Sequence, residues 1–289
     1  RFLTGFGVGG TLLASTILVA ESWTDRHRNV ALGILSITIP VGIFSAGLIT
    51  YFFPNWRSGF LTGVVPLAVA VVMQFSIFET EKWRKTRLEK TAVAARVSIF
   101  KGEIGRDLWF GSLVYGSMLI GLWAVFSWLP TWVQTLVEDS DGQRERGLSM
   151  ILFAVGGLSG GFASGWLSDR FGMRRTMLAC FAATFALTFL LFKTNTGLSL
   201  LVFIEIGGIA LFFGLSQGVL NGYIPKLFPT EVRSLATGFC FNIGRVFTAS
   251  VVFFVGWLET ALGGYGNALF SFSFVFLIGL AATFFSKEK

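Results

Sequence analysis

The stretch Gly165-Trp-Leu-Ser-Asp169-Arg170-Phe-Gly172-Met-Arg174-Arg175 decides the fold of this 289-residue chain. It places one aspartate and three arginines between two long apolar runs. Its shortness and its positive charge predict a tight hairpin that joins two membrane helices on the cytoplasmic side. A basic turn that merely anchors a hairpin in anionic lipid would explain the arginines, but not the glycine and aspartate that accompany them.

Composition also places the chain in a lipid bilayer. Hydrophobic residues make up 53% of the chain and charged residues 13%, and the mean hydropathy is +0.70. A soluble domain carries about 25% charged residues. The isoelectric point of about 9.7 would suit a nucleic-acid partner if the basic residues gathered on one soluble face, but they occupy short gaps between apolar runs. We therefore expect a membrane protein without a nucleic-acid partner.

Apolar runs of about 20 residues, the length that crosses a ~30 Å hydrocarbon core, predict an all-α membrane protein. Nine runs occur, at 2–20, 29–53, 58–78, 108–137, 147–167, 176–192, 198–224, 235–258 and 267–285. In the fourth run, Pro130 predicts a kink or an end at the interface. Seventeen of the 23 Lys and Arg residues lie in alternate gaps, so the positive-inside rule puts these gaps and residue 289 in the cytoplasm of a plasma (inner) membrane.

An internal repeat indicates that the chain contains two related halves. The triplet Glu21, Arg28 and Gly33 lies 205 residues before Lys226, Arg233 and Gly238. Each triplet spans a predicted cytoplasmic loop and the start of the next helix. Duplicated halves are typical of secondary transporters. If both loops join the fourth and fifth helices of a half, three helices precede Arg1, and nine of an inferred twelve are visible.

The pattern G-x-x-x-D-R-x-G-x-R-R in the 165–175 loop resembles the signature loop of the major facilitator superfamily. Residues 1–28 and 228–245 further resemble its proton-linked organic-acid branch, typified by sialate and monocarboxylate symporters, although Thr11 stands where those relatives commonly have an acid. The resemblance implies three parts. Residues 1–78 would hold helices 4–6 of an N-terminal bundle, 79–106 a cytoplasmic linker, and 107–289 a C-terminal bundle of six helices.

The linker at 79–106 is rich in charge, with eight Lys or Arg residues and four Glu. This pattern predicts a helical segment at the membrane surface, with Ile99 and Phe100 turned toward lipid. A regulatory or partner-binding role is the alternative to a simple connector.

Two ionisable residues lie well inside predicted spans. A charge near the bilayer centre costs at least ~2.5–3.5 kcal/mol unless it faces a partner or water. Glu205 and Arg245 lie on consecutive antiparallel spans, at roughly 10 and 15 Å depth given a rise of ~1.5 Å per residue. An ion pair between them would neutralise both. The pair is either purely structural or part of a site for a substrate anion and a proton, since the arginine fork binds carboxylates well.

Polar and aromatic side chains on the same spans are candidates for lining a cavity. Gln217 and Asn221 share one helix face, and Tyr115 and Trp123 share another. Hydrogen bonding between helices explains the amides equally well. We expect the substrate-binding residues to be Arg245, Glu205, Gln217, Asn221, Asn242, Thr11, Ser15, Tyr115, Trp123 and Gln134.

A glycine face and the charged loops form the predicted gate. Gly157, Gly161 and Gly165 recur every four residues, which lets a neighbouring helix approach closely. Asp169 should dock at the start of the helix near Asn29, beside Arg28, because a helix N-terminus carries positive charge. The predicted gating residues are Gly165, Asp169, Arg170, Arg174, Arg175, Glu21, Arg28 and Arg233.

No catalytic triad, phosphate loop or metal cluster is visible in the sequence, so we expect neither an enzyme, a cofactor nor a metal site. Cys180 and Cys240 are single residues in different spans and should be packing groups. His27 should be a solvated loop residue. We therefore predict a monomeric transporter of a small-molecule solute, favouring an organic anion with proton symport. A drug or metabolite exporter and a non-transporting membrane sensor are the alternatives.

Overall fold

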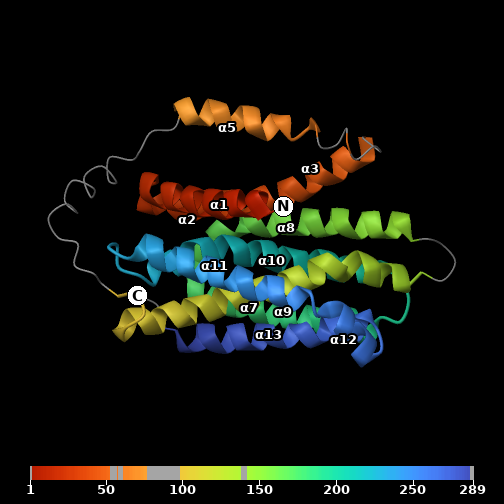
Figure 1. Ribbon diagram of the computed structural model, residues 1–289. Helices are drawn as coiled ribbons and strands as arrows, with labels where there is room; N and C mark the ends of the chain where they lie inside the picture. Colours follow the sequence, from red (N-terminus) through yellow and green to blue (C-terminus); the bar gives the residue numbers. More distant parts are fainter. Residues whose placement is uncertain (1, 53–56, 58–60, 77–97, 138–141, 287–289) are drawn as a thin grey trace.

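In the computed structural model, all regular structure in the described residues, which are 2–52, 57, 61–76, 98–137 and 142–286, is helical. The helices lie roughly along one direction (Figure 1). They are α1 (Phe2–Ser22), α2 (Asp25–Ser36), α3 (Thr38–Phe52), α5 (Val64–Ser76), α7 (Gly102–Thr135), α8 (Gln143–Phe171), α9 (Met173–Thr194), α10 (Leu200–Lys226), α11 (Arg233–Val252), α12 (Val255–Leu262) and α13 (Tyr265–Phe285).

The helices confirm an all-α membrane protein. Each of the nine predicted apolar runs overlaps at least one helix. Within the described ranges, five helices are long and apolar enough to cross a membrane: α7, the Glu145–Phe171 part of α8, α9, α10 and α13. The α11 and α12 pair, which bends by 45° at its break, makes a sixth if it is counted as one span. Helix α7 continues through Pro130 and ends five residues later, at Thr135.

Glycines let the sharp turns between helices form. Gly172 separates α8 from α9 with φ of 86°, a conformation that residues with a Cβ rarely adopt, so the 165–175 hairpin turns within one residue.

The predicted run at 29–53 is divided between α2 and α3 at Ile37. Pro40 lies in the first turn of α3, where its missing N–H group prevents α2 from continuing with full hydrogen bonding.

Helix α8 contacts its own half of the chain through one set of glycines. It packs most extensively on α10. A methyl group at Gly156 would collide with the Gly207 carbonyl of α10, and one at Gly160 would collide with the Leu211 carbonyl and lie 2.7 Å from the Leu215 nitrogen. The two helix backbones are therefore nearly in contact along this line.

A second glycine set on α8 contacts the helices before residue 53. A methyl group at Gly33 of α2 would lie 2.7 Å from Ser164 Oγ and 3.2 Å from the Gly161 carbonyl oxygen. Farther along, Pro40 Cγ lies 3.4 Å from the position that a Cβ of Gly157 would take. The α2–α3 segment therefore runs antiparallel to α8 on the predicted 157–161–165 face, and Figure 1 shows α1 and α2 beside α8.

The buried core joins α7, α9, α10, α11 and α13 through apolar side chains. Both free cysteines are buried in it, as expected of packing groups. Ile99 is 6% exposed and belongs to this core, so the prediction that it turns toward lipid is wrong, because the chain leading into α7 folds back onto protein. Phe100 is 56% exposed and packs edge-on against Phe239. The linker residues 79–97 lie outside the described part of the chain.

Candidate functional site

The site lies beside a close approach of α7 and α11. A methyl group at Gly244 would lie 2.9 Å from Tyr115 Cδ1 and 3.2 Å from the Cα of Gly116. Because neither glycine has a side chain, the two backbones meet here. The Tyr115 ring stacks on Phe241 at 4.4 Å between centroids. These contacts hold α11 in one rotation about its axis. This rotation sets the direction of the Arg245 side chain, which follows Gly244.

Arg245 is half-buried at the edge of this contact. Its Nη1 donates a long hydrogen bond of 3.5 Å to Asn242 Oδ1, one turn earlier. The buried Tyr115 hydroxyl lies within interaction range of the guanidinium. Across the interface, Gly9 of α1 is the facing residue, with 3.6 Å between Nη1 and the position of a glycine Cβ. The guanidinium therefore lies between α7, α11 and α1.

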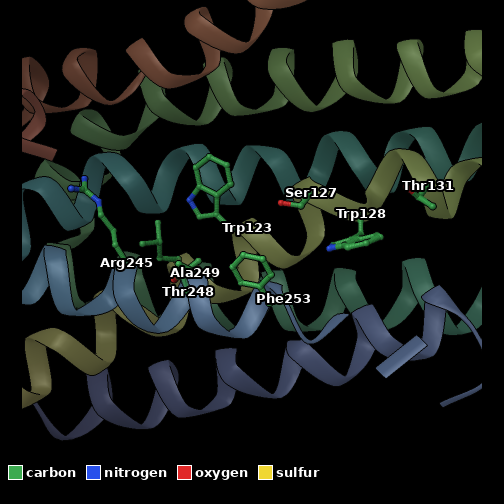
Figure 2. A pocket seen from close by; sticks show the side chains of 9 residues that line it. Trp123, Ser127, Trp128, Thr131, Arg245, Thr248, Ala249 and Phe253 are labelled. Carbon is green, nitrogen blue, oxygen red and sulfur yellow. The ribbon is translucent and has the colours of Figure 1, made fainter. Parts of the chain in front are cut away.

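A pocket of about 660 Å³ extends from Arg245 along the groove between α7 and α11. Figure 2 shows Arg245 at one end of the row of side chains and Thr131 at the other, with Trp123, Ser127 and Phe253 between them. The walls are mostly aromatic and aliphatic, with a few hydroxyl groups. The lining residues are Leu119, Trp123, Ser127, Trp128, Thr131, Arg245, Thr248, Ala249 and Phe253.

Four of the predicted binding residues come together here. Arg245 and Trp123 line the pocket, and Tyr115 and Asn242 contact the arginine at its end. Trp123 is 37% exposed, packs edge-on against Phe126 and lines the groove. A cation beside an open aromatic wall is an arrangement that binds planar anions.

The predicted ion pair between Arg245 and Glu205 is not present. Glu205 is 6% exposed and accepts a 2.7 Å hydrogen bond from Asn195 Nδ2, in the segment that follows α9. Asn195 also donates to the Leu191 carbonyl, at 3.1 Å. Similar depth on neighbouring spans did not bring the two charges together, because Glu205 faces the end of α9 whereas Arg245 faces α7 and α1.

The other predicted binding residues lie away from the pocket lining. Gln217 and Asn221 are on α10, and the buried Gln217 Nε2 has no hydrogen-bond partner among the residues that the structure describes. Gln134, near the end of α7, accepts a 3.2 Å hydrogen bond from Arg146. Thr11 on α1 donates to the Gly7 carbonyl at 2.9 Å, and Ser15 is half-buried on the same helix.

Sequence reasoning missed several lining residues, although a signal for them existed. Ser127 and Thr131 follow Trp123 at intervals of four, so they continue the same face of α7. Thr248 and Ala249 follow Arg245 by three and four residues. Phe253, the residue that follows α11, lies four residues after Ala249 and so continues the same face.

The two repeated arginines make equivalent contacts. Arg28 Nη2 donates to the Trp23 carbonyl at 3.3 Å, and Arg233 Nε donates to the Phe228 carbonyl at 3.2 Å. Both bonds span five residues and close the turn before a helix, and Trp23 and Phe228 are themselves 205 residues apart. The repeat therefore extends from sequence spacing to hydrogen bonding. The side chain of Glu21 lies outside the described residues.

Two arginines of the 165–175 loop make different contacts. Arg170 lies 5.5 Å from the Trp166 ring and 5.7 Å from the Phe171 ring, both exposed. Arg174 donates to the Thr283 carbonyl at 3.2 Å and to the Phe284 carbonyl at the end of α13. Arg175 and Asp169 are exposed. Arg174 therefore caps a helix C-terminus, where carbonyl groups lack partners within the helix.

We expect Arg174→Ala to destabilise the protein, because it removes charged donors from the last carbonyls of α13. The loss should be about 1–2 kcal/mol, the range of a charge-assisted hydrogen bond at a partly exposed site. Thermal unfolding in detergent measures it. Arg175→Ala, which removes the same charge from an exposed side chain in the same turn, is the matched control. Equal melting temperatures for the two variants would contradict the capping role.

No group of three or more His, Cys, Asp or Glu side chains suitable for a metal ion occurs within the described residues.

Comparison with known proteins places these features in context. The profile described as Major Facilitator Superfamily matches residues 1–251. The chain is 26% identical, over 100% of its own length and 71% of the other, to the cis,cis-muconate transport protein of Acinetobacter baylyi (strain ATCC 33305 / BD413 / ADP1). It is 27% identical, over 95% of its length and 65% of the other, to the probable 4-methylmuconolactone transporter of Cupriavidus pinatubonensis (strain JMP 134 / LMG 1197).

A solved structure shows the same fold. The chain superimposes with a TM-score of 0.76 and 18% sequence identity on the proton:xylose symporter XylE bound to 6-bromo-6-deoxy-D-glucose. The match covers 97% of this chain and 68% of the other. The chain thus spans about two thirds of the length of each of these proteins.

Proposed function

Because the chain belongs to the major facilitator superfamily, a family of membrane transporters rather than enzymes, we propose that it moves a small organic anion across the membrane by alternating access. The observation that carries this proposal is Arg245 at the end of a pocket of about 660 Å³ between α7 and α11. A cation in an apolar site attracts an anion strongly, since little water competes with it. A purely structural or sensing role would not need such a pocket.

The chemistry of the pocket favours a carboxylate with a flat, unsaturated body. The guanidinium fork of Arg245 presents paired donors that match two carboxylate oxygens. Trp123 and Phe253 offer ring faces against which a planar group can lie. The names of the two relatives, which refer to muconate and a muconolactone, support a substrate of this class.

We also propose proton symport, with Glu205 as the proton-carrying group. It is a buried carboxyl within a membrane-length helix, and intramembrane acids commonly serve proton relays. Because Glu205 lies apart from Arg245, proton movement would be coupled to substrate transport through movement of α10 and not through direct contact between Glu205 and the substrate. The protein would lie in the plasma (inner) membrane with residue 289 in the cytoplasm, as the basic loops indicate.

Uptake into proteoliposomes tests the proposed function. The purified protein should accumulate radiolabelled cis,cis-muconate or benzoate but not xylose, and an inward proton gradient should increase the rate. Protein-free liposomes and an ionophore that dissipates the gradient are the controls. Uptake of xylose with no uptake of either carboxylate would refute the anion proposal, and uptake insensitive to the gradient would refute symport alone.

We propose that residues 1–78 and 107–289 form two bundles joined by the 79–106 linker, with a cytoplasmic gate between them. The antiparallel contact of Gly33 with Gly161 and Gly165 supports this gate. Arg28 lies five residues before Gly33, and Asp169 lies four residues after Gly165. At ~1.5 Å per residue, both lie about one turn beyond the glycine contact, at the same end of it.

We expect Asp169→Asn to slow transport without unfolding the protein. An exposed charge contact contributes ~0–1 kcal/mol, so its loss should shift the balance of open states by up to about fivefold. Uptake rates together with membrane abundance and melting temperature measure the two effects separately. A double-mutant cycle with Arg28→Gln should show non-additive transport defects. Uptake by Asp169→Asn at the parent's rate would contradict the gating role. The 165–175 loop would then serve only to hold its hairpin on the cytoplasmic side of the membrane.

A further inference from the structure

Gly9 is the residue of α1 that faces the anion site. A Cβ at this position would lie 3.6 Å from Arg245 Nη1 and 3.9 Å from Asn242 Oδ1. The neighbouring glycines of α1 differ from it, because a Cβ at Gly5, Gly7 or Gly10 would meet no atom within 4 Å. Only at position 9 of this helix does a missing side chain leave space directly beside the guanidinium.

The space beside Arg245 matters because the arginine has donors to spare. A guanidinium carries five N–H groups. In the described part of the chain, Arg245 donates one long hydrogen bond of 3.5 Å to Asn242, and the Tyr115 hydroxyl also lies within reach of the guanidinium, which leaves further N–H groups for a ligand. Any polar side chain on the facing surface of α1 would compete for the remaining donors. Glycine supplies no such competitor and also leaves the most room.

We propose that Gly9 is a specificity-determining position, where the bare backbone of α1 leaves room for the oxygens of a carboxylate bound to Arg245. This inference rests on the proposed function of the α7–α11 pocket. It adds a contribution from α1 to a site whose lining comes otherwise from α7 and α11. A substrate bound to Arg245 would then bridge the two halves of the chain, so its size at the carboxylate end would be limited by position 9.

The proposal predicts that a carboxylate attached to α1 at this point takes the place of the substrate. A Cβ in ordinary contact with Nη1 puts the next atoms of an aspartate side chain within hydrogen-bonding reach of the guanidinium. Asparagine has nearly the same shape but no charge. The pair Gly9→Asp and Gly9→Asn therefore separates occupation of the anion site by charge from simple obstruction by volume.

Uptake of labelled cis,cis-muconate and benzoate tests the inference. Gly9→Asp should reduce uptake by about tenfold or more relative to Gly9→Asn, because a charged hydrogen bond must be broken before substrate binds. Gly5→Asn, an uncharged change one turn away on the same face with open space around it, should transport as the parent does. Equal uptake by Gly9→Asp and the parent, or equal loss in Gly9→Asp and Gly9→Asn, would overturn the specificity role.

A second measurement covers the case in which Gly9→Asp folds poorly. In thermal unfolding, the new carboxylate should raise the melting temperature relative to Gly9→Asn, and this difference should vanish in an Arg245→Ala background. A difference that persists without Arg245 would refute the contact. Failure of the parent to transport either carboxylate would instead refute the proposed function, so the two failures are distinguishable.

Discussion

Arg245→Ala should abolish uptake of organic anions while leaving the protein folded. The substitution leaves a substrate carboxylate in an apolar pocket without its charged partner, and truncation of one member of a buried charge pair costs ~2–5 kcal/mol. Affinity should therefore fall about thirtyfold or more. Isotherms for cis,cis-muconate or benzoate binding, and initial rates of uptake, measure the loss.

Arg245→Lys is the matched variant for this prediction. Lysine keeps the positive charge but loses the planar pair of donors, so transport should be weakened and not abolished. Melting temperatures should stay close to that of the parent in both variants, because Arg245 is half-buried and its described polar contacts are a long hydrogen bond to Asn242 and an approach to the Tyr115 hydroxyl. Wild-type uptake by the alanine variant would exclude Arg245 as the anion-binding group.

Gly160→Leu should prevent α8 and α10 from packing and yield little folded protein. Even a methyl group at this position collides with the Leu211 carbonyl, which belongs to helix backbone and cannot rotate away. Gly160→Ala should then cost ~1–3 kcal/mol, the usual range for overpacking, as the helices move apart. Detergent-resistant yield and thermal unfolding measure both effects.

The same helix provides the control for Gly160. A Cβ at Gly147 would meet no atom within 4 Å. Gly147→Ala should therefore be neutral or slightly stabilising, because alanine has a higher helix propensity than glycine. If Gly160→Ala melted at the same temperature as Gly147→Ala, the close approach of α8 and α10 would not contribute to stability.

Hydrophobic length was enough to predict where the helices lie, because a bilayer demands long apolar segments whatever their neighbours. It did not predict where they break. Pro40 explains the division between α2 and α3 after the fact. The break between α11 and α12 lies at Phe253 and Phe254, where the nearest helix-weakening residue is Gly256 in the first turn of α12. Such a bend depends on packing against other helices, which a hydropathy pattern does not encode.

The candidate site, like the helices, could be predicted only in part from the sequence. The cost of a charge in lipid correctly indicated that Arg245 turns toward protein, where it lies near Tyr115 and Trp123. The ion pair between Arg245 and Glu205, which similar depth in the membrane suggested, is wrong. Depth along the membrane normal fixes only one coordinate of a side chain, and the rotation of each helix fixes the others. For Arg245 that rotation depends on the contact between Gly116 and Gly244.

Ile99 illustrates why the end of the linker was misjudged. An apolar residue next to charged ones is equally compatible with lipid and with a protein core. Ile99 lies in the turn before α7, where Gly102 has φ of 62° and the Phe100 carbonyl oxygen would lie 2.5 Å from a Cβ at Gly105, so this turn packs tightly on the start of the helix. A hydropathy pattern does not contain this local packing.

The two glycine sets of α8 differ in register by one residue. Gly156 and Gly160 contact α10, and Gly161 and Gly165 contact α2, whereas Gly157 meets both Pro40 of α3 and Gly214 of α10. Each residue rotates a helix by about 100°. Inserting or deleting a single residue between Gly147 and Gly156 would therefore rotate the part of α8 that precedes the change, and its side chains would turn away from the neighbours they now contact. Evolution of α8 should therefore proceed by substitution alone, while changes in chain length are confined to the loops at its ends.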